Sequence, residues 1–217
     1  MADYTLVIGN KAYSSWSLRP WLALVQTGAP FTEVVVPLRQ PDTKATLLSH
    51  SPAGKVPVLK HGGRTIWDSL AVCEYLAERH PEAGLWPADA DARAHARCVV
   101  AEMHSGFQDL RRNLFMDLKQ RHHVPDRVAA AAADIARVQA IWEECRATHG
   151  AEGPFLFGGF TIADCFYAPV CTRFDTWGVA LSPVARAYAD AVLAHPAMVA
   201  WRKAALAEPW TIEYLAV

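Results

Sequence analysis

The stretch Asn10–Pro20, NKAYSSWSLRP, follows a short apolar segment and opens a helical pattern. The preceding residues, YTLVIG (Tyr4–Gly9), have the composition of a buried β-strand. From Trp16 onwards, apolar residues repeat at helical spacing. Many redox domains with this strand-then-helix order carry two cysteines at the helix start, whereas this chain has Ser14 and Ser17 there. The stretch therefore predicts a strand–helix unit with hydroxyls in place of thiols.

The remainder of the first eighty residues also contains short predicted strands and a helical pattern. A β-branched strand is predicted at Phe31–Val36, then a loop segment, then two short strands within KVPVLK (55–60) and RTIW (64–67), joined by a His-Gly-Gly hairpin. An Asp-Ser pair at 68–69 begins another amphipathic helix. The first two strands, joined through a helix, are expected to be parallel and the last two antiparallel. This order predicts a thioredoxin-like α/β domain over residues 1–80.

The second half of the chain has helical patterns and no convincing strand. Residues 81–87 contain two prolines and a glycine, and we expect the domain linker there. Residues 88–217 are predicted to form an all-helical bundle domain, and a Thr-x-x-Asp capping box at Thr161–Asp164 begins one of its helices. The predicted helices cover residues 89–121, 125–148, 161–175, 183–194 and 196–207.

Composition excludes several classes of protein. The chain has 217 residues, 52% hydrophobic and 20% charged, which argues against disorder. A net charge of −1 gives no electrostatic footprint for nucleic acid or an anionic membrane. The first residues lack the pattern of a secretory signal, and no apolar run reaches the length of a membrane span. Five cysteines without paired spacing predict buried free thiols and a cytoplasmic protein, and no cluster predicts a metal site.

Three serines surround the start of the first helix. Ser14, Ser15 and Ser17 could cap the helix, but one hydroxyl is enough for that purpose. No His or Asp adjoins them, so nothing local marks an activated nucleophile. Because a helix N-terminus favours anions, we expect these hydroxyls to donate to an anion on a bound ligand. Capping alone remains the alternative.

Two further motifs in the first domain indicate a ligand that resembles a peptide. The Val56–Pro57 step in GKVPVL predicts a cis bond that exposes the backbone of Val56 to an extended ligand. The alternative is an edge strand that begins with proline. Asp68 and Ser69 form an ordinary helix cap, or they grip the ammonium and carboxylate groups of an amino acid.

Taken together, these motifs resemble the cytosolic glutathione S-transferase family over the whole chain. The SSWS segment is most similar to the serine-using, zeta-like classes, whose Ser-Ser-Cys-Ser pattern is soon followed by arginine, here Arg19. The resemblance implies that glutathione is the co-substrate and that Ser14 activates its thiol, with Ser15, Trp16 and Ser17 nearby. It also implies glutathione contacts at Lys55 (glycyl carboxylate), Val56 and Pro57 (cysteinyl backbone), and Asp68 and Ser69 (γ-glutamyl end).

The resemblance places a hydrophobic second substrate between the two domains. Met103, Phe107 and Leu110 form one apolar face of the predicted helix 89–121, and Arg111 beside them could meet an acidic substrate. Bundle core and solvated surface are the alternatives for these residues. Trp16 replaces the cysteine of the zeta pattern, so isomerase activity does not carry over directly.

The leading hypothesis is an enzyme that directs the glutathione thiolate at hydrophobic electrophiles, as a homodimer. A glutathione-dependent isomerase similar to maleylacetoacetate isomerase, or a peroxidase, would use the same thiolate. A non-catalytic transferase-like protein, such as those associated with bacterial RNA polymerase, is the rival from another class. Proteins of that kind tend to lose the site residues, whereas this chain retains Ser14, Val56, Asp68 and Ser69. The sequence leaves open the second substrate and which serine activates the thiol.

Overall fold

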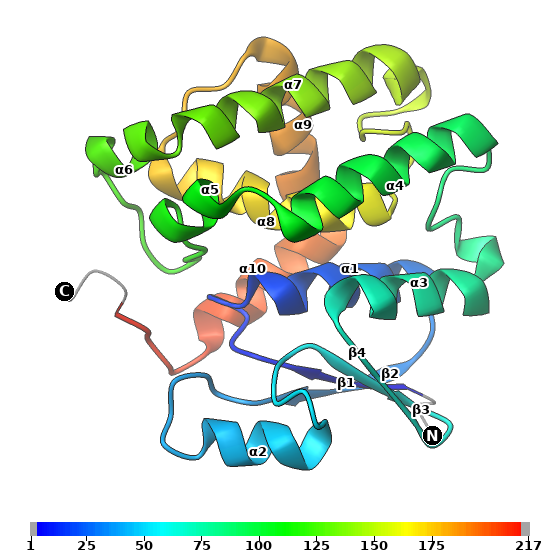
Figure 1. The fold of residues 1–217 in the computed structure, drawn as a ribbon, viewed down its shortest axis with the longest axis vertical. Helices are drawn as coiled ribbons and strands as arrows, with labels where there is room; N and C mark the ends of the chain where they lie inside the picture. The colour runs from blue at the N-terminus through cyan, green and yellow to red at the C-terminus, as the bar shows by residue number, and fades with distance from the viewer. Residues whose placement is uncertain (1–3, 214–217) are drawn as a thin grey trace.

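The structure, a computed structural model, describes residues 4–213. The chain begins with a four-stranded mixed sheet flanked by helices and continues as a set of helices (Figure 1). This arrangement confirms the predicted fold class. Within the described range, every helix is too short or too polar to cross a lipid bilayer.

The sheet has the strand order β2-β1-β3-β4. Strands β1 (Tyr4–Ile8) and β2 (Phe31–Val35) are parallel, and β3 (Val58–His61) and β4 (Arg64–Trp67) are antiparallel, as predicted. Side chains alternate across β1, so Leu6 and its neighbours on one face pack in the main core while Val7 packs on the other face.

Helices cover both faces of this sheet. Helices α1 (Ser15–Thr27) and α3 (Ser69–Arg79) lie between the sheet and the C-terminal helices, and α2 (Thr43–His50) covers the opposite face (Figure 1). The sequence-based prediction of a loop before β3 was wrong, because α2 occupies it. Leu47 is the buried side chain of α2, and a single buried position gives no helical stripe in the sequence.

The C-terminal part is helical. Its elements are α4 (Ala90–Ser105), α5 (Gln108–Asn113), α6 (Pro125–Ala130), α7 (Ala132–His149), the turn η2 (Gly150–Glu152), α8 (Ile162–Trp177), α9 (Pro183–Ala194) and α10 (Pro196–Ala207). The predicted single helix 89–121 was wrong. Gly106 caps α4, Phe107 has a left-handed φ of 60°, and α5 ends at Asn113. We propose that the domain boundary lies at 81–87, which includes the turn η1 (Pro81–Ala83) between α3 and α4.

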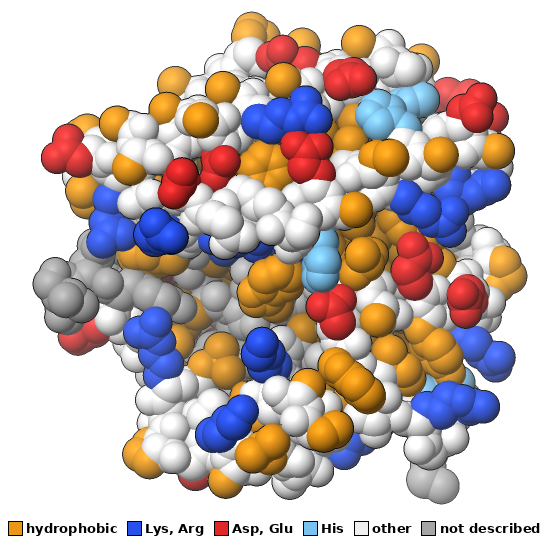
Figure 2. Space-filling view, in the orientation of Figure 1, with side chains coloured by type: hydrophobic (Ala, Val, Ile, Leu, Met, Phe, Trp, Pro, Cys, Tyr) orange, Lys and Arg blue, Asp and Glu red, His pale blue; other side chains and the backbone are white. Residues whose placement is uncertain are grey.

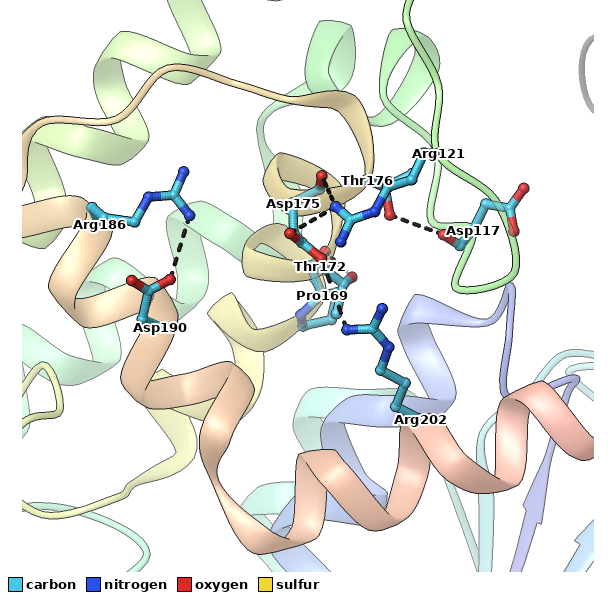
Figure 3. Close-up of polar contacts among 9 residues, drawn as sticks. All are labelled: Asp117, Arg121, Pro169, Thr172, Asp175, Thr176, Arg186, Asp190 and Arg202. Carbon is cyan, nitrogen blue, oxygen red and sulfur yellow. Dashed lines mark hydrogen bonds and ion pairs between the residues drawn. The ribbon is translucent and has the colours of Figure 1, made fainter.

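Helix α8 is the buried centre of the C-terminal part. The predicted capping box begins it: the Asp164 carboxylate accepts the Thr161 N–H over 2.8 Å. At its other end, Asp175 pairs with Arg121 over 2.7 Å and Thr176 Oγ1 donates to Asp117 O over 2.9 Å (Figure 3). These contacts fix the loop after α5 against α8.

The five cysteines are all free. Four of them are buried, as predicted, and Cys98 on α4 is exposed, contrary to that prediction. Burial raises the pKa of Cys73, Cys165 and Cys171, so these thiols are unreactive.

Candidate active site

The loop between β1 and α1 is fixed by contacts with distant parts of the chain. Within it, the Ser14 N–H donates to Asn10 O over 2.8 Å and closes a tight turn. The indole N–H of Trp201, in α10, donates to Lys11 O over 2.9 Å, and the Glu208 carboxylate accepts the Lys11 N–H over 2.8 Å. The loop before α1 is therefore held by α10 and by the residue that follows it.

The three serines occupy three different environments. Ser14 is the N-cap of α1, and its Oγ accepts the Ser17 N–H over 3.3 Å. Ser17 Oγ accepts the Gly9 N–H over 3.0 Å and lies 2.7 Å from Ser14 Oγ. Ser15 Oγ accepts from the Arg173 guanidinium over 3.1 Å. If the Ser17 hydroxyl donates to Ser14, the proton of Ser14 is left for a ligand.

A cavity of about 450 Å³ lies beside these serines. Figure 2 shows the surface hollowed between the C-terminal helices and the sheet, with Lys and Arg side chains on both sides of the hollow. Lys55, Arg111 and Arg173 line this serine cavity, and no acidic side chain does so among residues 4–213. Its lining also includes Tyr13, Ser14, Ser15, Trp16, Leu38, Leu47, Gly54, Val56, Phe115 and Met116.

A second cavity, of about 720 Å³, lies beside the start of α3. Asp68 caps α3 with a left-handed φ of 74°, and its Oδ1 accepts the Leu70 N–H over 2.8 Å. Its Oδ2 lies 3.3 Å from Nε2 of His104, which comes from α4. Ser69 is 1% exposed, and none of the residues in the described range offers its Oγ a hydrogen bond. This Asp68 cavity is lined by Trp16, Ala53, Lys55, Val56, Pro57, Trp67, Asp68, Ser69 and His104.

The two cavities share a wall formed by Trp16, Lys55 and Val56. The Val56–Pro57 bond is cis, which confirms that prediction. Strand β3 begins at Val58, so the backbone of Val56 lies outside the sheet ladder, between the cavities. The predicted glutathione-contacting residues except Ser17 therefore line one continuous edge of the N-terminal part. Ser17 is fully buried beneath Ser14.

Cationic side chains dominate the charge around this wall. Arg19 is fully buried, and desolvation, followed by the charges of Arg111 and Arg173, lowers its pKa. Burial also lowers the pKa of Arg111. Burial lowers the pKa of His104 against the opposing effect of Asp68. The site is thus suited to an anion at the serine cavity and to a cation beside Asp68.

The predicted substrate-binding residues divide into two groups. Arg111 lines the serine cavity. Met103, Phe107 and Leu110 are buried in the core and line neither cavity. The break after α4 separates Met103 from Phe107 and Leu110, and all three side chains pack in the hydrophobic core.

Sequence reasoning missed several residues that line the cavities. Arg173 lies within the apolar run of α8, where a lone arginine was a usable signal. Phe115 and Met116 follow α5 in irregular structure, and His104 reaches the Asp68 cavity from α4. Nothing in their sequence spacing connects these residues with the serines.

Comparisons with known proteins agree with this architecture. The family model described as "Glutathione S-transferase, N-terminal domain" matches residues 13–79, and "Glutathione S-transferase, C-terminal domain" matches residues 125–204. A probable maleylacetoacetate isomerase from Caenorhabditis elegans is 30% identical over 84% of this chain and 85% of its own.

Two solved structures extend the likeness. The holo structure of a maleyl pyruvate isomerase, a bacterial zeta-class glutathione S-transferase, is 26% identical with a TM-score of 0.73, covering 96% of this chain and 100% of its own. A glutathione transferase homologue from Burkholderia GL BGR1, with bound glutathione, is 25% identical with a TM-score of 0.68, covering 93% and 97%. The chain therefore belongs to the glutathione S-transferase family of glutathione-dependent enzymes, and zeta-class isomerases are among its relatives.

Proposed function

We propose that glutathione lies extended across both cavities, with its thiol beside Ser14. Asp68 and Ser69 would hold the γ-glutamyl end, since a carboxylate and a buried hydroxyl without a partner among the described residues suit an ammonium and a carboxylate. Val56 would pair with the cysteinyl backbone, and Lys55 would reach the glycyl carboxylate. The support is the order of these groups along the shared wall of the cavities.

Ser14 would stabilise the thiolate, with Ser15 and Ser17 in supporting roles. The Ser14 hydroxyl has access to the serine cavity. Its partner Ser17 is buried, and the Ser17 hydroxyl already accepts the Gly9 N–H. The thiol proton would leave to solvent, because no acidic side chain or histidine of the described residues lines this cavity. The N-terminus of α1 would add a potential that favours the anion.

We infer that the second substrate is an anionic, unsaturated electrophile. The single observation that carries this inference is that Arg111 and Arg173, in addition to the Lys55 assigned to glutathione, meet Ser14 in one cavity without a lining carboxylate. Phe115 and Met116 would contact its apolar part, in place of the core residues Met103, Phe107 and Leu110. The relatives described as isomerases favour cis–trans isomerisation.

The reaction would begin with attack of the thiolate on one carbon of the double bond. A C–S bond forms and the π electrons move to the conjugated carbonyl, which gives an enolate. Rotation about the resulting single bond follows. Return of the electron pair breaks the C–S bond and releases the thiolate and the trans isomer. The guanidinium groups of Arg111 and Arg173 would stabilise the negative charge. Conjugation would use the same first step without the release.

The test combines binding with a substrate panel. We expect retention on glutathione resin, followed by conversion of a cis-unsaturated keto acid without consumption of glutathione. A neutral aryl halide and an organic hydroperoxide complete the panel. Net consumption of glutathione in the presence of the keto acid would show that the enzyme catalyses conjugation and not isomerisation. Absence of glutathione binding would contradict the whole proposal.

We also propose a cytoplasmic homodimer. The five free thiols suit a reducing compartment. Trp67, on the edge strand β4, is 48% exposed at the rim of the Asp68 cavity, which suits a surface covered by a second copy. Light scattering of the wild type and Trp67→Lys tests this: the wild type should be dimeric, and a monomeric wild type would contradict it.

A further inference from the structure

We propose that Trp16 determines specificity for anionic electrophiles by holding the Arg111 guanidinium at the serine cavity. This inference rests on the proposed function above and assigns a role to the residue that departs from the zeta pattern. Trp16 is 37% exposed and is one of three residues that line both cavities. Its side chain is therefore placed to act between the thiol and the second substrate.

The indole ring of Trp16 contacts three basic side chains from three helices. The guanidinium carbon of Arg19 lies 4.3 Å from a ring centroid of Trp16, and that of Arg111 lies 4.8 Å from one. The His104 ring meets the indole edge-on at 5.5 Å. Both arginine distances lie within the range of cation–π attraction. The ring thus joins α1 to α4 and α5 at the cavity wall.

Apart from this ring, the end of α4 and the charge of Asp134 hold Arg111. Its Nε donates to Gly106 O over 2.9 Å and its Nη2 donates to Met103 O, so the end of α4 holds one side of the guanidinium. Neither of these contacts is with a carboxylate, and Asp134 attracts the guanidinium from beyond ion-pair distance. Because Arg111 lines the serine cavity, Nη1 is the nitrogen left to meet a substrate anion. The guanidinium lies over the indole ring, so the ring limits the positions that this nitrogen can take.

A second arginine, Arg19, makes the position of the Arg111 guanidinium more dependent on Trp16. Arg19 is fully buried, and its Nε and Nη1 have no hydrogen-bond partner among residues 4–213. Arg19 and Arg111 both contact the indole ring of Trp16. Their like charges repel each other, and the π electrons of the ring attract both. Without the ring, Arg111 can lower this repulsion by turning toward solvent. It would then leave the serine cavity.

The experiment measures binding of an anionic and a neutral ligand to Trp16 variants. The unreactive analogue S-methylglutathione fills the glutathione site, and calorimetry gives the dissociation constants of 3-nitrobenzoate and nitrobenzene. Trp16→Leu should weaken 3-nitrobenzoate binding about tenfold and change nitrobenzene binding less than twofold. Trp16→Phe keeps an aromatic face and should recover most of the loss. Arg111→Gln should match Trp16→Leu, and the double variant should add little further loss.

Two control variants isolate the effect. Trp86→Leu removes another tryptophan that stacks with an arginine, Arg97 at 5.4 Å, away from both cavities. Arg112→Gln removes one positive charge next to Arg111 on an exposed side chain. Both should leave 3-nitrobenzoate binding unchanged, and circular dichroism verifies that each variant is folded.

The outcomes separate this inference from the proposed function. Unchanged 3-nitrobenzoate binding in folded Trp16→Leu would overturn the role of Trp16 even if the wild type binds glutathione and isomerises a keto acid. Equal losses for both ligands would reduce Trp16 to a packing residue and would also overturn it. Failure to bind S-methylglutathione contradicts the proposed function instead, and 3-nitrobenzoate titrated alone still decides the role of Trp16.

Discussion

The imidazole Nε2 of His104 lies 3.3 Å from Oδ2 of Asp68, so a residue of α4 meets the N-cap of α3 inside the Asp68 cavity. The two side chains come from the helical part and the α/β part of the chain. Their contact makes the charge beside the proposed γ-glutamyl position depend on the protonation of His104.

Glutathione affinity should therefore fall in acid. Burial lowers the pKa of His104 below the ordinary value of 6.5, Asp68 opposes this, and Arg19 and Arg111 reinforce it. At pH 7 the imidazole is neutral and leaves the Asp68 carboxylate for the ligand ammonium. Protonation below the pKa neutralises that carboxylate and repels the ammonium. Calorimetry between pH 5 and 8 should show a dissociation constant that rises as pH falls.

His104→Gln is the matched variant for this prediction. It keeps a polar side chain beside Asp68 but does not titrate. Its dissociation constant for glutathione should stay nearly constant in the acid range where that of the wild type rises. Identical pH profiles for the two proteins would show that His104 does not control the charge at this site.

Replacement of Ser14 and Ser17 by alanine should give different defects. Free thiols have a pKa of about 8.5, and lowering it by about two units stabilises the thiolate by roughly 2.7 kcal/mol. Ser14→Ala should return the pKa of the bound thiol toward the free value, with a smaller effect on binding. Ultraviolet titration of the thiolate in the bound complex measures this shift.

Ser17→Ala serves as the comparison for Ser14→Ala. It leaves the buried Gly9 N–H without its acceptor, so it should destabilise the fold by about 1–3 kcal/mol. Ser17→Ala should shift the pKa of the bound thiol less than Ser14→Ala does, because Ser17 reaches the thiol only through Ser14. A larger shift in Ser17→Ala would transfer the activating role to Ser17.

Ser69→Ala should separate binding from stability. The buried Ser69 hydroxyl has no hydrogen-bond partner within the described residues, so its removal breaks no bond of the free protein. The unfolding midpoint should change little, while glutathione affinity should fall about tenfold with the loss of a hydrogen bond to a charged group. Ser51→Ala should do the reverse, since buried Ser51 Oγ accepts the Ala53 N–H over 3.2 Å and Ser51 itself lines neither cavity. Equal affinity in Ser69→Ala would contradict its assignment.

Asp164 should control stability and its pH dependence. Burial raises its pKa to about 6 from 3.8, although hydrogen bonds from Thr161, Leu156 and Tyr188 oppose the rise. Between pH 4 and 6 the native state therefore binds more protons than the unfolded state, and the free energy of unfolding falls as pH rises through this window. The contribution is at most about 3 kcal/mol. Urea unfolding of wild type and Asp164→Asn should show this slope in the wild type alone.

Asp164→Ala should lower stability without altering the chemistry. The substitution leaves the buried donors of Leu156, Thr161 and Tyr188 without an acceptor, at a cost of about 3 kcal/mol. Turnover per folded molecule should match the wild type, because Asp164 lines neither cavity. A loss of turnover in fully folded protein would give Asp164 a further role.

Local sequence signals were sufficient to predict the features of the structure that depend on neighbouring residues along the chain. Pro183 and Pro196 start α9 and α10, and Thr161 begins α8, because caps and proline positions act within one helical turn. The periodicity near Phe107 failed because apolar spacing continues through a backbone break that a left-handed residue creates. The missed Arg173 contacts Ser15 and Leu114, and no spacing rule spans those separations.

The contact between Trp201 and the carbonyl of Lys11 has a consequence for the order in which the protein is made. The two residues are 190 positions apart, so the sheet leaves the ribosome long before α10 exists. Until then the loop before Ser14 lacks one of its anchors. During synthesis the N-terminal part can form its strands and helices, but the proposed thiol site receives this anchor only after α10 has emerged.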